Sequence, residues 1–203
     1  MDISALSSIV VISLLGAMTP GQSVIMVGRN TIANGKSHGI VTACSHAVGV
    51  GIYALLCLVG LAATLKASPL LFNGIMYTGA GFLAWLGFQA LTSKKGLAER
   101  ISAGEKATYK ESAAQGFAMA ILNPKVIIFF LALFSQFIND SYTATEIAIV
   151  ALIPAVLDAA WYSFVATIVS RPKILEKLRN NAGIVDKVSG VILIALAIKV
   201  VTG

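Results

Sequence analysis

The chain has 203 residues, of which 57% are hydrophobic and only 12% are charged, and its net charge is +6. A soluble domain usually has about 25% charged residues, and a disordered chain has too little apolar surface to bury, so the composition excludes both. The positive charge does not indicate nucleic-acid binding, because the Lys and Arg residues lie between apolar runs, as in the cytoplasmic loops of membrane proteins. The sequence predicts an integral membrane protein without room for a soluble domain.

Six apolar runs are long enough to cross a bilayer, which takes about 20 residues per helix. They cover residues 4–27, 39–65, 70–91, 113–138, 146–169 and 184–202. The last run is the weakest, because Asp186, Lys187 and Lys199 lie near its ends. Cys44 and Cys57 both fall in the second run, about 20 Å apart on a helix and too far for a disulfide. We expect an all-α membrane protein with six transmembrane helices.

Basic residues are divided unevenly among the connections between these runs. Twelve of the 15 Lys and Arg residues fall in the first, third and fifth connections, while the other side of the membrane holds only Lys66 and Lys199. The positive-inside rule then places the odd-numbered loops in the cytoplasm and both termini outside. In the fifth loop, Ile174, Leu175 and Leu178 recur at helical spacing, which fits either an amphipathic helix on the inner leaflet or a charged linker. The start of the chain lacks the basic region of a signal peptide, so we expect the first run to be retained.

The first and fourth runs are each interrupted by a proline among polar residues. The interruptions are Thr19-Pro20-Gly21-Gln22 and Asn123-Pro124-Lys125. Proline removes a helical hydrogen bond, and the freed carbonyl groups need partners in protein or in a water-filled cavity. Each broken run opens a group of three spans, so the pattern favours two inverted three-helix repeats whose breaks meet at a transporter site. The repeats cover residues 1–91 and 113–203, joined by a cytoplasmic loop at 92–112; the alternative is two kinks without a ligand.

Asp158 lies near the centre of the fifth run, where an ionised carboxylate costs about 2.5 to 3.5 kcal/mol on insertion scales. Lys125 is equally central in the fourth run, and a Lys125–Asp158 pair would neutralise both charges. Such a pair could be static and only fix helix packing. Otherwise Asp158 exchanges a proton or binds the ammonium group of a substrate during transport.

The second run carries a stripe of small and polar residues at every fourth position. Its members are Ser45, Gly49, Tyr53 and Cys57. Such a stripe is typical of a close helix–helix interface. His46, next to the stripe, is an alternative candidate for a proton carrier.

A metal site built from Cys44, His46 and Asp158 is disfavoured by helix geometry. Cys44 and His46 are two residues apart and therefore point about 200° apart on a helix. No metal-binding or nucleotide-binding motif, and no nucleophile with its base, is present in the sequence. We expect no metal, no cofactor and no enzymatic activity.

The motifs around both breaks resemble the lysine exporter (LysE/RhtB) family of amino-acid exporters. The resemblance is carried, in chain order, by Thr19-Pro20-Gly21, Asn34-Gly35, the stretch 78–87, Asn123-Pro124-Lys125, Phe134-Ser135-Gln136-Phe137 and Asp158. It covers nearly the whole chain, and the Asn-Pro-Lys element with the downstream Gln-Phe is its most specific part. The family usually has proline where this chain has Gln22 and Ser135, and we expect these differences to bear on the substrate more than on the fold.

The resemblance implies a bacterial inner-membrane exporter of amino acids or close derivatives, of the threonine/homoserine or neutral aliphatic type, driven by the proton motive force. Its substrate-binding residues would be Thr19, Pro20, Gly21, Gln22, Asn123, Pro124 and Lys125. Half-helix dipoles and Lys125 suit a carboxylate, and Asp158 suits an ammonium group or the coupled proton. The partners are then the amino acid, the bilayer and protons, and a homodimer fits so small a transporter. The alternative is an exporter of metal or other inorganic ions with similar architecture.

Overall fold

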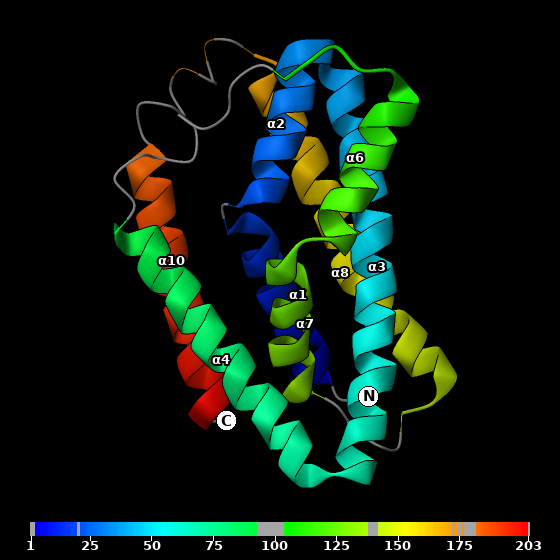
Figure 1. Ribbon diagram of the computed structural model, residues 1–203, viewed down its shortest axis with the longest axis vertical. Helices are drawn as coiled ribbons and strands as arrows, with labels where there is room; N and C mark the ends of the chain where they lie inside the picture. Colours follow the sequence, from blue (N-terminus) through cyan, green and yellow to red (C-terminus); the bar gives the residue numbers. More distant parts are fainter. Residues whose placement is uncertain are drawn as a thin grey trace.

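The computed structural model describes residues 3–19, 21–92, 104–137, 142–171, 173, 176 and 182–202. These residues form eight α-helices and no strand, which confirms the all-α prediction. The helices are α1 (Ile3–Met18), α2 (Gln22–Asn34), α3 (Lys36–Ala67), α4 (Pro69–Thr92), α6 (Tyr109–Ile121), α7 (Pro124–Ser135), α8 (Ala144–Val169) and α10 (Ala182–Thr202). Most of them run along the long axis of the molecule (Figure 1), as expected for a bundle that crosses a membrane.

The described helices provide between three and five candidate membrane spans. α3, α4 and α8 are each long and apolar enough to cross a membrane. The bent pairs α1–α2 and α6–α7, with bends of 58° and 50°, add two more if each pair is one span. α10 is not among these candidates. Every 18-residue stretch of it contains three charged residues, Asp186, Lys187 and Lys199. The sixth span and the inverted-repeat arrangement therefore stay predictions.

The sequence explains why the fourth apolar run forms two helices. Asn123 is the N-cap of α7, and its side-chain oxygen accepts a hydrogen bond from the backbone N–H of Lys125 at 3.0 Å. Pro124 occupies the first helical position, where no backbone N–H is needed. The Asn-Pro pair thus ends α6 and starts α7 in a new direction, so the break is a helix cap rather than a simple kink.

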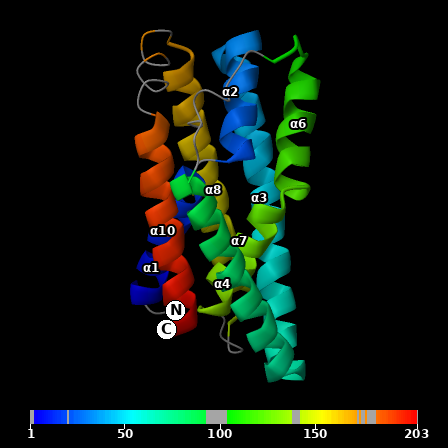
Figure 2. The ribbon, with the colours of Figure 1, turned by 60° about the vertical axis from the view of Figure 1, so that its left-hand side comes forward.

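Close helix pairs hold the bundle together. α3 packs along both α8 and α6, and α4 packs along α10 (Figure 2). The predicted stripe on α3 is confirmed as an interface with α6: Ser45 donates to the carbonyl of Ala113 at 2.6 Å, and the Tyr53 hydroxyl donates to the carbonyl of Ile121. Because Gly116 has no side chain, α6 can approach the backbone of α3 this closely.

The first and third predicted loops meet at one end of the bundle. Gly35, with φ of +94°, makes the turn from α2 to α3. Beside it, the Asn34 side chain donates to the carbonyl of Glu105 at 3.2 Å and accepts from the N–H of Ala107 at 2.8 Å. The end of α8 lies at this same end of the molecule (Figure 1). The amphipathic pattern predicted at 174–178 falls, apart from position 176, outside the described residues.

Candidate functional site

The two helix breaks contact each other in the middle of the molecule. The Lys125 ammonium at the start of α7 donates to the backbone carbonyl of Thr19 at the end of α1, with an Nζ–O distance of 2.9 Å. A Cβ atom on Gly21 would lie 3.3 Å from the same Nζ atom. Asn123 in the second break donates to the Ser23 hydroxyl in the first turn of α2 at 3.3 Å. Segments about a hundred residues apart in the sequence thus form one polar centre.

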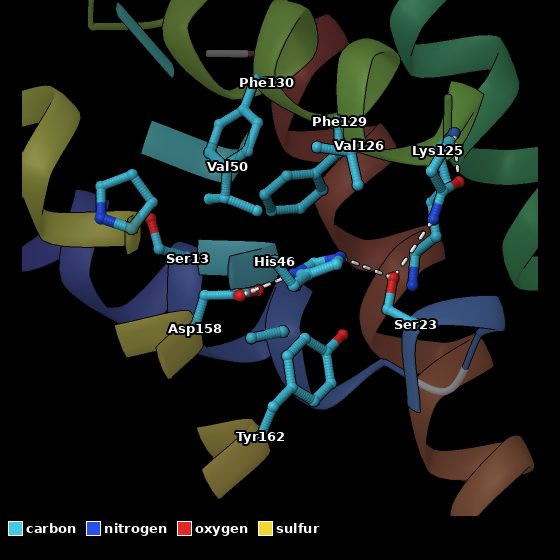
Figure 3. Close-up of a pocket in the computed structure, with 14 residues that line it drawn as sticks. Ser13, Ser23, His46, Val50, Lys125, Val126, Phe129, Phe130, Asp158 and Tyr162 are labelled. Carbon is cyan, nitrogen blue, oxygen red and sulfur yellow. Dashed lines mark hydrogen bonds and ion pairs between the residues drawn. The ribbon is translucent and has the colours of Figure 1, made fainter. Parts of the chain in front are cut away.

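A chain of hydrogen bonds crosses this centre from α8 through α3 to α2 (Figure 3). His46 Nδ1 lies 2.7 Å from Asp158 Oδ2, and His46 Nε2 lies 2.9 Å from Ser23 Oγ. Asn123 extends the chain to the second break through its bond to Ser23. None of the four residues is more than 5% exposed. The chain links both broken helices to the two long helices α3 and α8.

The contact with His46 explains how a carboxylate can be buried among apolar helices. An isolated buried charge costs several kcal/mol, and a hydrogen-bonded partner offsets part of that cost, most of all a partner of opposite charge. Asp158 has a hydrogen-bonded partner in His46, whose ring carries the opposite charge when it is protonated. The ring of Tyr162 stands edge-on to the imidazole, with 5.2 Å between ring centroids, and helps to fix its orientation. The pair is therefore held in one geometry at the wall of a cavity.

The cavity beside the pair measures about 40 Å³ and is lined by residues from α1, α2, α3, α7 and α8 and from the second break. Since one water needs about 10 to 15 Å³ by this measure, the space holds a few waters and not a whole amino acid. An amino acid can therefore bind here only if the lining helices move apart.

The cavity is lined by polar groups that still have hydrogen-bonding capacity. The Ser13 hydroxyl is 4% exposed and has no hydrogen-bond partner among the residues that the structure describes. Leaving a buried hydroxyl unpaired costs about 1 to 3 kcal/mol, so this group favours a water or ligand in the cavity. The Lys125 ammonium uses one of its three N–H donors on Thr19.

Part of the cavity lining, the apolar wall, consists of hydrocarbon side chains. Val50, Val126, Phe129 and Phe130 form it, and Figure 3 shows Val50 and both rings together on one side of His46. A Cβ atom on Gly16 would collide with the Phe129 ring, so the glycine in α1 makes room for this ring. The cavity therefore offers charged groups to one part of a ligand and a hydrocarbon surface to another part.

The predicted site residues fall into three groups. Asn123, Lys125 and Asp158 line the cavity, and Thr19 and Gly21 lie at the contact between the breaks. The side chains of Gln22 and Pro124 are exposed and are not among the lining residues. Pro20 lies outside the described residues. The predicted Lys125–Asp158 pair is wrong, because Asp158 pairs with His46 while Lys125 bonds to a backbone carbonyl.

Sequence reasoning missed several of the lining residues. The omitted polar ones are Ser13, Ser23 and Tyr162. Two of them had a usable signal: Ser23 follows the break by less than one helical turn, and Tyr162 lies four residues after Asp158, on the same helix face. Ser13 had none, because serine is ordinary within a membrane helix.

Among the described residues, Cys44 and His46 do not come together as metal ligands. Cys44 is exposed, whereas His46 is buried against Asp158. In the part of the chain that the structure describes, no three His, Cys, Asp or Glu side chains gather closely enough to hold a metal ion.

Apolar helices that bury a carboxylate–histidine pair beside a cavity, where two broken helices meet, are typical of membrane transport proteins. The chain belongs to the LysE type translocator family, which matches residues 14–203, and members of this family are transporters rather than enzymes.

Known relatives agree with this assignment. The chain is 27% identical over 197 residues to the uncharacterized membrane protein YrhP of Bacillus subtilis, covering 93% of this chain and 94% of YrhP. It is 30% identical over 177 residues to a leucine efflux protein of Klebsiella pneumoniae, covering 81% and 82% of the two chains. It is 29% identical over 153 residues to a leucine efflux protein of Salmonella typhimurium, covering 72% and 70%. No solved structure matches the chain.

Proposed function

We propose that the protein exports a neutral aliphatic amino acid such as leucine across the cytoplasmic membrane in exchange for protons. The observation that carries the proposal is the cavity where the helix breaks meet, whose lining includes a carboxylate, a lysine and several aromatic and aliphatic side chains. An α-amino acid with a hydrocarbon side chain likewise combines two charged groups, the ammonium and the carboxylate, with an apolar side chain. The relatives named as leucine efflux proteins support the same substrate class.

In this proposal the substrate's ammonium group binds at Asp158. A carboxylate beside a cavity is a suitable partner for a primary ammonium, and charge-assisted hydrogen bonds are about twice as strong as neutral ones. The unpaired hydroxyl of Ser13 supplies a second acceptor. In Figure 3, Ser13 and Asp158 lie on one side of His46, and Lys125 lies on the other. The two ends of a zwitterion can thus bind on opposite sides of the imidazole.

The substrate's carboxylate then binds near Lys125 and the first turn of α2. Gly21 is the N-cap of α2 and makes no side-chain cap, so the first N–H groups of α2 lack the kind of cap that Asn123 gives α7. A helix N-terminus with free N–H groups favours an anion, and here the Lys125 ammonium adds a full positive charge beside it.

The apolar wall favours an aliphatic side chain over that of threonine or homoserine. Val50, Val126, Phe129 and Phe130 offer no side-chain hydrogen bond to a substrate hydroxyl. Burying a hydroxyl without a partner costs about 1 to 3 kcal/mol, while each buried methylene group contributes about 0.8 kcal/mol. The neutral aliphatic type therefore suits this wall better.

The proposed architecture has six spans in two inverted halves, residues 1–91 and 113–203, in a bacterial inner membrane with both termini outside. The packing supports it, because α3 pairs with α8 and α4 pairs with α10, which are corresponding members of the two halves. α2 and α7 both start at the central contact and run from it in opposite directions (Figure 1). The homodimer stays a prediction, which the mass of the detergent-solubilised protein would test.

The proposal is tested by flux measurements on the purified protein in liposomes. We expect liposomes loaded with unlabelled leucine to take up labelled leucine faster than protein-free liposomes do, and external threonine, homoserine or lysine to compete weakly. The absence of leucine flux from protein that is correctly folded and inserted would contradict the proposal. Flux of a divalent metal ion in its place would favour the alternative exporter class.

A further inference from the structure

The structure shows a histidine whose two ring nitrogens both have partners, one of them a carboxylate and the other a hydroxyl. We propose that His46 carries the exchanged proton, and that the protonated imidazole and the substrate's ammonium group compete for the carboxylate of Asp158. This inference rests on the proposed function, because it assigns the coupling step to a residue of the same site.

The hydrogen bonds around His46 can accommodate the ring in both protonation states without a shift of heavy atoms. In the neutral ring, Nδ1–H donates to Asp158 and Nε2 accepts from the Ser23 hydroxyl. In the imidazolium, Nε2–H donates to Ser23 Oγ, which also accepts from Asn123, and the hydroxyl hydrogen of Ser23 turns elsewhere. Ser23 can act as donor or acceptor, so it allows a proton to be loaded or released.

The charges facing His46 make simultaneous binding of a proton and an ammonium group unfavourable. Asp158 is the carboxylate of the group, and Lys125 from α7 lines the same cavity as a cation. The other groups near His46 are uncharged. They are Ser23 on α2, Asn123 at the start of α7 and Tyr162 on α8. An imidazolium and a bound ammonium would both need the one carboxylate, in surroundings where like charges repel strongly.

The competition produces an exchange in which protons balance. A proton from the outer solution binds Nε2 of neutral His46 and forms an imidazolium paired with Asp158. When an amino acid arrives from the cytoplasm, its ammonium group takes over the carboxylate, and Nε2 of His46 returns the proton to water on the cytoplasmic side. One proton then enters for each amino acid that leaves, and no other reactant is needed.

The chain contains only two histidines, which allows a direct test. His38 lies outside the cavity, bonded to the hydroxyl of Ser112 at 2.9 Å and stacked on Tyr109, so His38→Gln leaves a protein whose single histidine is His46. Nitrogen-15 NMR of the labelled ring distinguishes imidazolium from neutral imidazole. At a pH low enough for the ligand-free protein to give the imidazolium signal, we expect saturating leucine to convert the ring to the neutral form. Unchanged protonation of His46 on leucine binding would overturn the inference.

A second measurement uses His46→Asn, with His38→Gln as the matched control. The asparagine amide can still donate a hydrogen bond to Asp158, but it does not gain or lose a proton in this pH range. In weakly buffered solution, at a pH where the NMR signal shows the imidazolium before leucine is added, we expect the wild type and the control to release about one proton per leucine bound. We expect the His46→Asn variant to release no proton when leucine binds and to lose flux driven by a pH gradient. Proton release by this variant would assign the proton to Asp158 and overturn the inference. If the wild type bound no leucine, the proposed function itself would fail.

Discussion

Replacing Asp158 by asparagine removes the negative charge from the site with little change of shape. The amide oxygen can still accept the hydrogen bond from His46 Nδ1, which spans 2.7 Å in the native protein. Asp158 is only 5% exposed, so solvent does not compensate for the lost charge. The substitution therefore leaves the helix packing intact and weakens the attraction for the ammonium group of the substrate.

The expected size of the effect follows from the burial of the ion pair. Removing one partner of a buried, hydrogen-bonded charge pair costs about 2 to 5 kcal/mol of binding free energy. Because the amide keeps one hydrogen-bonding function, we expect the lower part of that range, about 2 to 3 kcal/mol. This corresponds to roughly a 30- to 150-fold rise in the Kd for leucine.

The assay compares leucine with isocaproate, which lacks only the amino group. Isothermal titration calorimetry on the detergent-solubilised wild type and the Asp158→Asn variant gives a Kd for each of the two ligands with each protein. We expect the substitution to weaken leucine binding as calculated and to leave isocaproate binding unweakened, because isocaproate has no group that needs the carboxylate. Equal losses for both ligands would mean that Asp158 only supports the structure, and the reasoning would be refuted.

Three further substitutions test other parts of the site and the bundle. Lys125→Met should raise the Kd for leucine about tenfold or more in the same titration and barely affect isoamylamine, which lacks a carboxylate. Phe129→Ala removes a ring from the apolar wall, so it should enlarge the cavity and raise phenylalanine flux relative to leucine flux in liposomes. Gly116→Ala places a Cβ against the backbone of Thr42 and should destabilise the protein by about 1 to 3 kcal/mol, lowering the Tm in detergent. Gly60→Ala, which meets nothing within 4 Å, is the control and should leave the Tm unchanged or raised.

Several features of the site could be predicted because they follow from local sequence. The Asn123-Pro124 pair specifies a helix N-cap wherever it occurs, so the break before α7 was readable. A carboxylate in the middle of an apolar run needs a partner, so Asp158 could be identified as a functional candidate. The polar stripe that includes Ser45 and Tyr53 has helical spacing, which predicted a close helix–helix interface, while its partner α6 is known only from the structure.

The partner of Asp158 could not be predicted, because it depends on how three helices are rotated and shifted against one another. Lys125 and His46 were both available as basic partners within apolar runs. The structure turns His46 toward α8 and uses Lys125 to bind the carbonyl of Thr19 at the break. Gln22 shows the same limit, since its place next to the break suggested a lining role while its side chain is exposed.

The most direct test of the central claim asks whether the amino acid occupies the cavity between the two breaks. Ser13→Cys, in a protein whose Cys44 and Cys57 are replaced by alanine, places one thiol at the cavity wall. The account predicts that saturating leucine slows the reaction of this thiol with a small methanethiosulfonate reagent at least about tenfold, while lysine does not. An unchanged labelling rate at leucine concentrations that saturate transport would contradict it.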